Sequence, residues 1–426
     1  MKLTNWKMDY EGYRSLDCVA PCDMYSVLLQ HGLISDPYYG TNEETLTDLS
    51  KNDCTFYSSF SLTDDELNRE KIDLNFYGLD TICHIYLNGT LLGKVMNMHR
   101  MYSYDVKSLV GKENEIRLEF TGPIKYFEEM ENMHHLYMDG AAVTGASHLR
   151  KALYMSGWDW APRVPNMGIF RPVELCAYDG DKIEDTEITQ HHENGQVVLE
   201  IKADTKHRAQ GLAIYCEVDG QRIRLENGKG EITIKNPRLW WPNNLGEQNL
   251  YDVTFELCQG DKVIDTQTKT IGLRTIVLCR ENDEYGQEFC FSVNGVKVFA
   301  MGANYVPMDS IPTRETPERL ERLIKDCIFA HVCWILCADH CAHQGGDPTR
   351  CKVLLRYHDA PRRSTRARRT PPRTRRGVVC TGKLFFKRLR YRSVPLRPNC
   401  PCGLPGGILS LRSPKSHGIS SHWKNG

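Results

Sequence analysis

The chain has 426 residues, of which 41% are hydrophobic and 25% charged, so it can form two to four domains with substantial cores. It contains no apolar run of about 18 residues, which excludes an ordinary membrane-spanning helix. The stretch after Met1 lacks the apolar segment of a signal peptide, and we therefore expect a cytoplasmic protein.

The net charge of zero hides two unlike parts. Residues 333–426 hold 20 Lys and Arg against 3 Asp and no Glu, whereas residues 1–332 hold 34 Lys and Arg against 51 Asp and Glu. Of the 17 cysteines, ten are scattered through residues 1–332 and seven are crowded into the remainder. In a cytoplasmic chain, the first ten are typical of reduced core residues rather than a disulfide framework.

Residues 1–178 are rich in short predicted strands. The stretch "KIDLNFYG" alternates apolar Ile72, Leu74 and Phe76, and "NEIRLEF" repeats that alternation. Asn88-Gly89 stands between two apolar runs, which is the strongest short signal for a β-hairpin. Many short strands joined by polar turns predict a jelly-roll sandwich.

Residues 179–275 form a second strand-rich block. The stretches "VVLEIKAD" and "LYDVTFELC" both alternate apolar and polar residues. A block of this size and pattern fits one immunoglobulin-like sandwich. For Trp240 and Trp241, in "NPRLWWPNN", we expect core packing and turn formation.

The spacing of apolar residues changes in residues 276–332, from the alternation of strands to a pattern that includes a helix. A hairpin is expected at Asn294-Gly295, followed by a further strand and an amphipathic helix. Thr316 is a good N-cap, Pro317 suits the first helical position, and the apolar stripe consists of Leu320, Leu323, Ile324, Cys327 and Ile328. Strand, loop and helix in this order predict the first unit of a (β/α)8 barrel.

The stretch "YMSGWDWAP" places Asp159 between Trp158 and Trp160. One interpretation is a core tryptophan beside a turn aspartate. The other is a sugar site, because aromatic faces stack on the apolar face of a pyranose and a carboxylate accepts hydrogen bonds from its hydroxyls.

The order of these parts resembles the β-mannosidases of glycoside hydrolase family 2. The resemblance extends over about residues 1–332 and rests on "GWDWAP", "GIFRPVEL", "LWWPNNLGEQNLY", "IGLRTI" and "FSVNGVKVFAMGANYVP". Other members, such as β-galactosidases and β-glucuronidases, share the architecture, and the Trp-Asp-Trp motif favours the mannosidase branch.

The resemblance implies that Trp158, Asp159 and Trp160 contact the terminal mannose of a β-mannoside oligosaccharide, as in an exo-acting enzyme. Asn304, at the end of the expected first barrel strand, lines the pocket or forms a turn. Arg150 braces the loop or is simply solvated. The resemblance implies no metal or organic cofactor, and we expect neither a nucleic acid nor a membrane as partner; the oligomeric state stays open.

A retaining glycosidase needs two carboxylates about 5–5.5 Å apart. In the family these are glutamates far along the barrel, but no glutamate follows Glu321 in this chain. We therefore expect the chain as written to be a truncated β-mannosidase without activity. The alternatives are a carbohydrate-binding β-sandwich protein without catalysis, or another family 2 glycosidase such as a β-galactosidase.

Residues 333–426 form a basic tail rich in Arg, Pro and Cys, for which we expect disorder. Three interpretations stand. The stretch "CWILCADHCAH" could ligate zinc, although no second matched pair of ligands follows it. The candidate ligands are Cys333, Cys337, His340, Cys341 and His343. The stretch "RRSTRARRTPPRTRRG" could bind nucleic acid phosphates, although it lacks interleaved aromatics. The interpretation we favour is a shifted reading frame, because hydrophobic periodicity ends abruptly.

Overall fold

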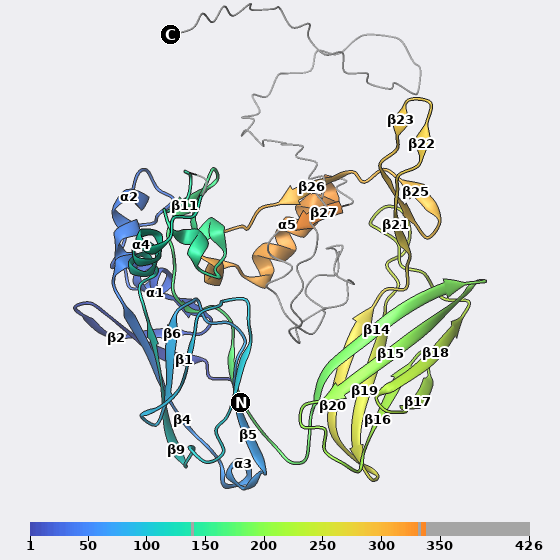
Figure 1. Ribbon diagram of the computed structural model, residues 1–426, viewed down its shortest axis with the longest axis horizontal. Coiled ribbons are helices and arrows are strands. Elements are labelled where there is room, and N and C mark those ends of the chain that lie inside the picture. Colours follow the sequence, from blue (N-terminus) through green and yellow to red (C-terminus); the bar gives the residue numbers. More distant parts are fainter. Residues whose placement is uncertain (138–139, 331–333, 338–426) are drawn as a thin grey trace, which may run out of the picture. The chain divides into compact units, whose positions relative to one another are not determined.

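The computed structural model describes residues 1–137, 140–330 and 334–337 (Figure 1). These residues are mainly β, as the sequence predicts. None of the helices among them is both long and apolar enough to span a bilayer.

Two sheets enclose the core of the first part of the chain. The antiparallel six-stranded sheet has the order β2 (Tyr13–Val19), β1 (Asn5–Tyr10), β4 (Cys54–Ser61), β9 (Glu113–Phe120), β6 (Cys83–Leu87) and β7 (Thr90–Val95). The three-stranded sheet consists of β13 (Val173–Tyr178), β5 (Lys71–Phe76) and β8 (Tyr102–Asp105). Both sheets contribute fully buried side chains to one cluster, among them Phe56, Leu118 and Leu74. The alternation read from the sequence thus marks the core faces of these strands.

Short elements complete this part. They are β3 (Cys22–Asp23) paired with β12 (Gly168–Ile169), β10 (Ser156–Trp158) paired with β11 (Ala161–Arg163), and the helices α1 (Met24–Gln30), α2 (Glu43–Leu46), α3 (Asp64–Asn68) and α4 (Pro123–Met133), with 3-10 turns at Thr47–Lys51, Ala146–His148 and Leu153–Met155. Asp23 and Thr63 cap α1 and α3 in reciprocal capping boxes. Asn88 and Gly89 both have positive φ, at 49° and 79°, in the predicted hairpin between β6 and β7.

The second part has two antiparallel sheets around a separate core. One sheet contains β14 (Ile183–Glu193), β15 (Gln196–Thr205) and β18 (Lys229–Lys235), and the other β17 (Gln221–Leu225), β16 (Leu212–Val218), β19 (Tyr251–Gln259) and β20 (Lys262–Ile271). Val197, Leu199 and Phe255 are fully buried between them. Trp240 is only 7% exposed and Arg274 lies over its ring, so the structural interpretation of this tryptophan is confirmed.

The third part begins with β21 (Ile276–Cys279), β24 (Cys290–Val293) and β25 (Val296–Val298) in one antiparallel sheet, with a small β22 (Asn282–Asp283) and β23 (Gly286–Gln287) ribbon. Next come β26 (Gly302–Tyr305), a 3-10 turn (Pro312–Arg314), α5 (Pro317–Phe329) and β27 (Trp334–Cys337). The side chain of Thr316 accepts a hydrogen bond from the N–H of Arg319, so the predicted cap of α5 is confirmed. Of the predicted apolar stripe only Ile324 is buried.

Strand β27 corrects one expectation. It pairs in parallel with β26, and α5 connects the two, which gives a βαβ unit. Regular structure therefore continues to Cys337, past the boundary at residue 332 beyond which we expected a disordered tail. Trp334 and Ile335 are strong strand formers. The rest of that tail, with its basic stretch, lies outside the described residues.

Candidate functional site

The Trp-Asp-Trp motif forms the tip of a hairpin. Trp158 pairs with Ala161 across β10 and β11, so Asp159 and Trp160 are the two residues of the turn. Three residues of two types able to bind a sugar, Trp and Asp, are thus presented at one point of the chain.

The two tryptophans have different environments. Trp160 stacks on Tyr154, with ring centroids 5.7 Å apart and an angle of 29° between the planes. It packs against a small buried cluster that includes Met98 and Met155. Trp158 is 42% exposed. The core interpretation therefore fits Trp160, while Trp158 leaves an aromatic surface open to a ligand.

Asp159 is exposed at the turn. Within the described part of the chain, its carboxylate has no hydrogen-bond or ion-pair partner. Both oxygens can therefore accept hydrogen bonds from adjacent hydroxyls of a ligand. An exposed tryptophan beside such a carboxylate offers an aromatic face and two acceptor oxygens, which are groups that bind a sugar.

Gly157 and Arg163 fix the hairpin against the segment before it. Gly157 has φ +110°, and a Cβ there would lie 2.6 Å from the carbonyl oxygen of Ala141. Arg163 donates from Nε to that same carbonyl at 3.0 Å, and its N–H donates to the carboxylate of Glu43 at 2.9 Å. The position of the turn is thus set by contacts from both strands of the hairpin.

A buried ion pair fixes the chain on either side of the hairpin. Lys151 Nζ donates to the carboxylate of Asp80 and, at 2.8 Å, to the carbonyl oxygen of Asn166. Lys151 is 8% exposed and Asp80 is 3% exposed. Burial holds the pKa of Lys151 below its usual value, although the Asp80 carboxylate opposes this shift. The adjacent Arg150 is exposed, so Lys151, which the sequence analysis did not single out, braces the loop.

Asp23 joins the first part of the chain to the segment after β26. Its carboxylate accepts hydrogen bonds from the N–H of Ser26, at 2.7 Å, and from the hydroxyl of Thr313. Burial raises the pKa of Asp23, and these donors partly offset that rise. Ile311, close to Thr313, is fully buried in the first core.

A second contact to the same segment involves Tyr38. Its hydroxyl donates to the carboxylate of Asp309 at 3.2 Å, and Arg314 Nε lies 3.2 Å from that carboxylate. Together with Asp23 and Thr313, these contacts hold residues 309–314 on the first part of the chain.

Asn304 is the residue expected at the end of the first barrel strand. It lies in β26, in register with Leu336 of β27, and its side chain lies outside the description. Its role as a ligand-lining residue stays a prediction. Of the candidate zinc ligands in the tail, only Cys337 lies within the described residues, at the end of β27.

Sequence comparison places the two sandwich parts in one known group of proteins. The family description "Glycosyl hydrolase 2 galactose-binding domain-like" matches residues 6–171, and "Glycosyl hydrolases family 2" matches residues 181–274. The β-mannosidase of the goat, Capra hircus, is 28% identical over 359 residues, and β-mannosidase B of Emericella nidulans is 26% identical over 348 residues. These matches cover 77% and 76% of this chain and 41% of each relative.

The fold agrees with a solved structure from the same group. The crystal structure of β-D-mannosidase from Dictyoglomus thermophilum superposes with a TM-score of 0.73 at 29% identity. The match covers 79% of this chain and 43% of that one. The present chain therefore spans less than half the length of the proteins that it resembles.

Proposed function

The chain belongs to glycoside hydrolase family 2 and resembles the β-mannosidases, and from this premise we propose that the β10–β11 hairpin binds the terminal mannose of a β-mannoside. The observation that carries the proposal is the pairing of an exposed Trp158 with an Asp159 carboxylate that has no partner in the described chain. The lineage activity is that of a retaining exo-β-mannosidase, which removes mannose from non-reducing ends.

The proposed roles follow from the geometry. Asp159 accepts hydrogen bonds from two neighbouring hydroxyls of the sugar. Trp158 covers the apolar face of the ring, and Trp160 is held in place by its stacking on Tyr154. Lys151 and Gly157 position the hairpin without touching the sugar.

Hydrolysis requires a carboxylate pair that the sandwiches do not supply. By family resemblance both members are glutamates of the barrel, and no glutamate follows Glu321 in these 426 residues. We therefore expect no turnover of an aryl β-mannoside by the 426-residue polypeptide. Release of the aryl group above the rate of a buffer blank, by protein free of other glycosidases, would overturn that expectation.

Binding tests the proposal directly. We expect saturable but weak binding of methyl β-mannoside to the full chain in calorimetry, because the hairpin supplies only one side of a pocket. Asp159→Ala removes the carboxylate and is expected to weaken binding by about tenfold, since charged hydrogen bonds contribute about 1.5–3 kcal/mol. The matched control is Asp261→Ala, an exposed aspartate at the turn between β19 and β20, which should bind like the wild type.

Two alternatives are separated by the same titration. A family 2 glycosidase of another branch, such as a β-galactosidase, would bind methyl β-galactoside in preference to the mannoside. A carbohydrate-binding protein without catalysis would bind with useful affinity while still showing no turnover.

A further inference from the structure

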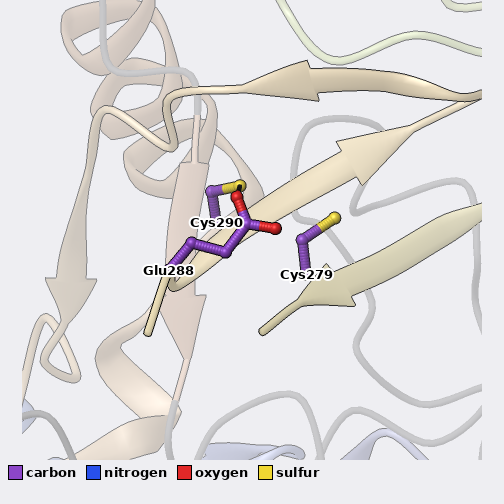
Figure 2. A group of neighbouring side chains, drawn as sticks. All are labelled: Cys279, Glu288 and Cys290. Atoms are coloured by element: carbon purple, nitrogen blue, oxygen red, sulfur yellow. Dashed lines mark hydrogen bonds between the residues drawn. The ribbon is translucent and has the colours of Figure 1, made fainter. Parts of the chain in front are cut away.

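Strands β21 and β24 carry a cluster that the proposed function does not use. Cys279 lies opposite Cys290 in the antiparallel register. Glu288 lies two residues before Cys290, just outside β24, and its backbone N–H donates to the carbonyl oxygen of Glu281. The two sulfur atoms and a carboxylate oxygen of Glu288 all lie within 4.8 Å of one another. In Figure 2 the Glu288 carboxylate lies between the two thiols.

The backbone pairing disfavours a disulfide at this position. The N–H of Asn294 donates to the carbonyl oxygen of Thr275 at 3.0 Å, and that of Glu288 to Glu281 at 2.8 Å. Hydrogen-bonded pairs recur at every second position of an antiparallel ladder, so the cysteines between them also form such a pair. In a hydrogen-bonded pair the distance between the two Cβ atoms lies near the upper end of the usual range of about 4.5–5.5 Å. A disulfide needs a Cβ–Cβ distance of about 3.5–4.5 Å.

The same spacing suits a bridging ion. A tetrahedral zinc ion has bonds to sulfur of about 2.3 Å and therefore holds two thiolates about 3.8 Å apart. We propose that Cys279, Glu288 and Cys290 form a binding site for a thiophilic divalent cation such as Zn²⁺. Glu281, on the same face as Glu288, or a water molecule supplies the fourth ligand.

Lys297 modulates this site. It lies on β25 opposite Ser292, and its Nζ is 3.0 Å and 2.9 Å from the two carboxylate oxygens of Glu288. The ammonium group therefore competes with a cation for this carboxylate. Removing it frees Glu288 for the ion, so the affinity should rise rather than fall.

The ion would strengthen a weakly packed sheet. The cluster of buried apolar residues in this sheet contains only Val293 and Val298. An ion bound by these three side chains would link β21 to β24 and stabilise a sheet whose apolar core is small.

The test is a Co²⁺ titration of the full chain in a non-thiol reductant. The seven cysteines of residues 333–426 are replaced by Ser in the parent protein, so that no thiolate of the tail can contribute to the absorption; they are Cys333, Cys337, Cys341, Cys351, Cys380, Cys400 and Cys402. We expect one equivalent of Co²⁺ to produce thiolate-to-cobalt charge-transfer absorption that Zn²⁺ abolishes. Its absence would overturn the proposal.

Three variants assign the ligands in that parent. Cys279→Ser and Cys290→Ser should each reduce the absorption and weaken binding by about tenfold or more, since even changes around a ligand cost that much. Cys176→Ser, a partly buried cysteine opposite Asp73 on β13 and β5, is the matched control and should change nothing. An unchanged spectrum in the Cys279 or Cys290 variant would refute the assignment.

Lys297→Ala covers the case in which a cysteine variant fails to fold. It leaves all three ligands intact, and we expect it to bind Co²⁺ several-fold more tightly. Unchanged or weaker binding in this variant would exclude Glu288 as a ligand.

Discussion

Lys151 and Asp80 are separated by 71 positions in the sequence but form a buried ion pair next to the proposed sugar-binding hairpin. The carbonyl oxygen of Asn166 accepts a second hydrogen bond from Lys151, so the ammonium group ties three segments together. Such a pair contributes to the position of the loop more than to net stability, because burying both charges offsets most of their attraction.

Removing one partner of this pair has a predictable cost. Lys151→Ala leaves the Asp80 carboxylate buried without its cation, and we expect a loss of about 3–5 kcal/mol in the free energy of unfolding. Lys125→Ala, which breaks the exposed pair with Asp53, should cost less than about 1 kcal/mol. Urea unfolding of both variants measures the difference, and equal losses would contradict the structural role given to Lys151.

At the residue scale, the sequence predicts the candidate sugar site but not the environment of each residue in it. The tripeptide Trp158-Asp159-Trp160 predicts a candidate sugar site, but it does not distinguish the two tryptophans. Their difference arises from the stacking of Trp160 on Tyr154, which depends on the turn geometry rather than on residue type. Lys151 gives no signal in the sequence, because its partner is distant along the chain.

At the scale of elements, two tyrosines anchor the 3-10 turn Thr47–Lys51 and the helix α2 to the first core. Tyr10 donates to the carbonyl oxygen of Leu49, and Tyr25 to that of Leu46, both at 2.8 Å. Burial raises the pKa of Tyr10 to about 12, and it also raises the pKa of Tyr25. These short helical turns therefore depend on protonated phenols.

This dependence predicts alkaline destabilisation. Between pH 10 and about pH 12 the unfolded chain has lost the Tyr10 proton and the folded chain retains it, so stability falls as the pH rises. The fall due to Tyr10 is at most about 1.4 kcal/mol per pH unit. Unfolding midpoints across this range should therefore decline less steeply in Tyr10→Phe, and parallel curves for the two proteins would refute the account.

Local signals predicted the elements well. The hairpins at Asn88-Gly89 and Asn294-Gly295 both have positive φ at Asn and Gly, as a two-residue turn requires. The cap of α5 at Thr316 is another feature set by neighbouring residues. By contrast, the burial of Ile311 in the first core depends on packing between segments about 300 positions apart, and no local pattern contains it.

At the scale of the whole molecule, the chain is a glycoside hydrolase family 2 protein that spans about two fifths of its β-mannosidase relatives. The domain boundaries at residues 178 and 275, the barrel as a whole and the cytoplasmic location stay predictions. The βαβ unit of β26, α5 and β27 is the only parallel pairing among the described strands.

The central claim is that the tip of the β10–β11 hairpin contacts mannose. The most direct measurement is to follow the indole N–H resonances of the full chain by NMR while methyl β-mannoside is added, with Trp158 assigned from a Trp158→Phe variant. We predict that the Trp158 resonance shifts in a saturable manner while that of the buried Trp240 stays fixed. A titration in which Trp158 does not move, or moves no more than Trp240, would contradict the account.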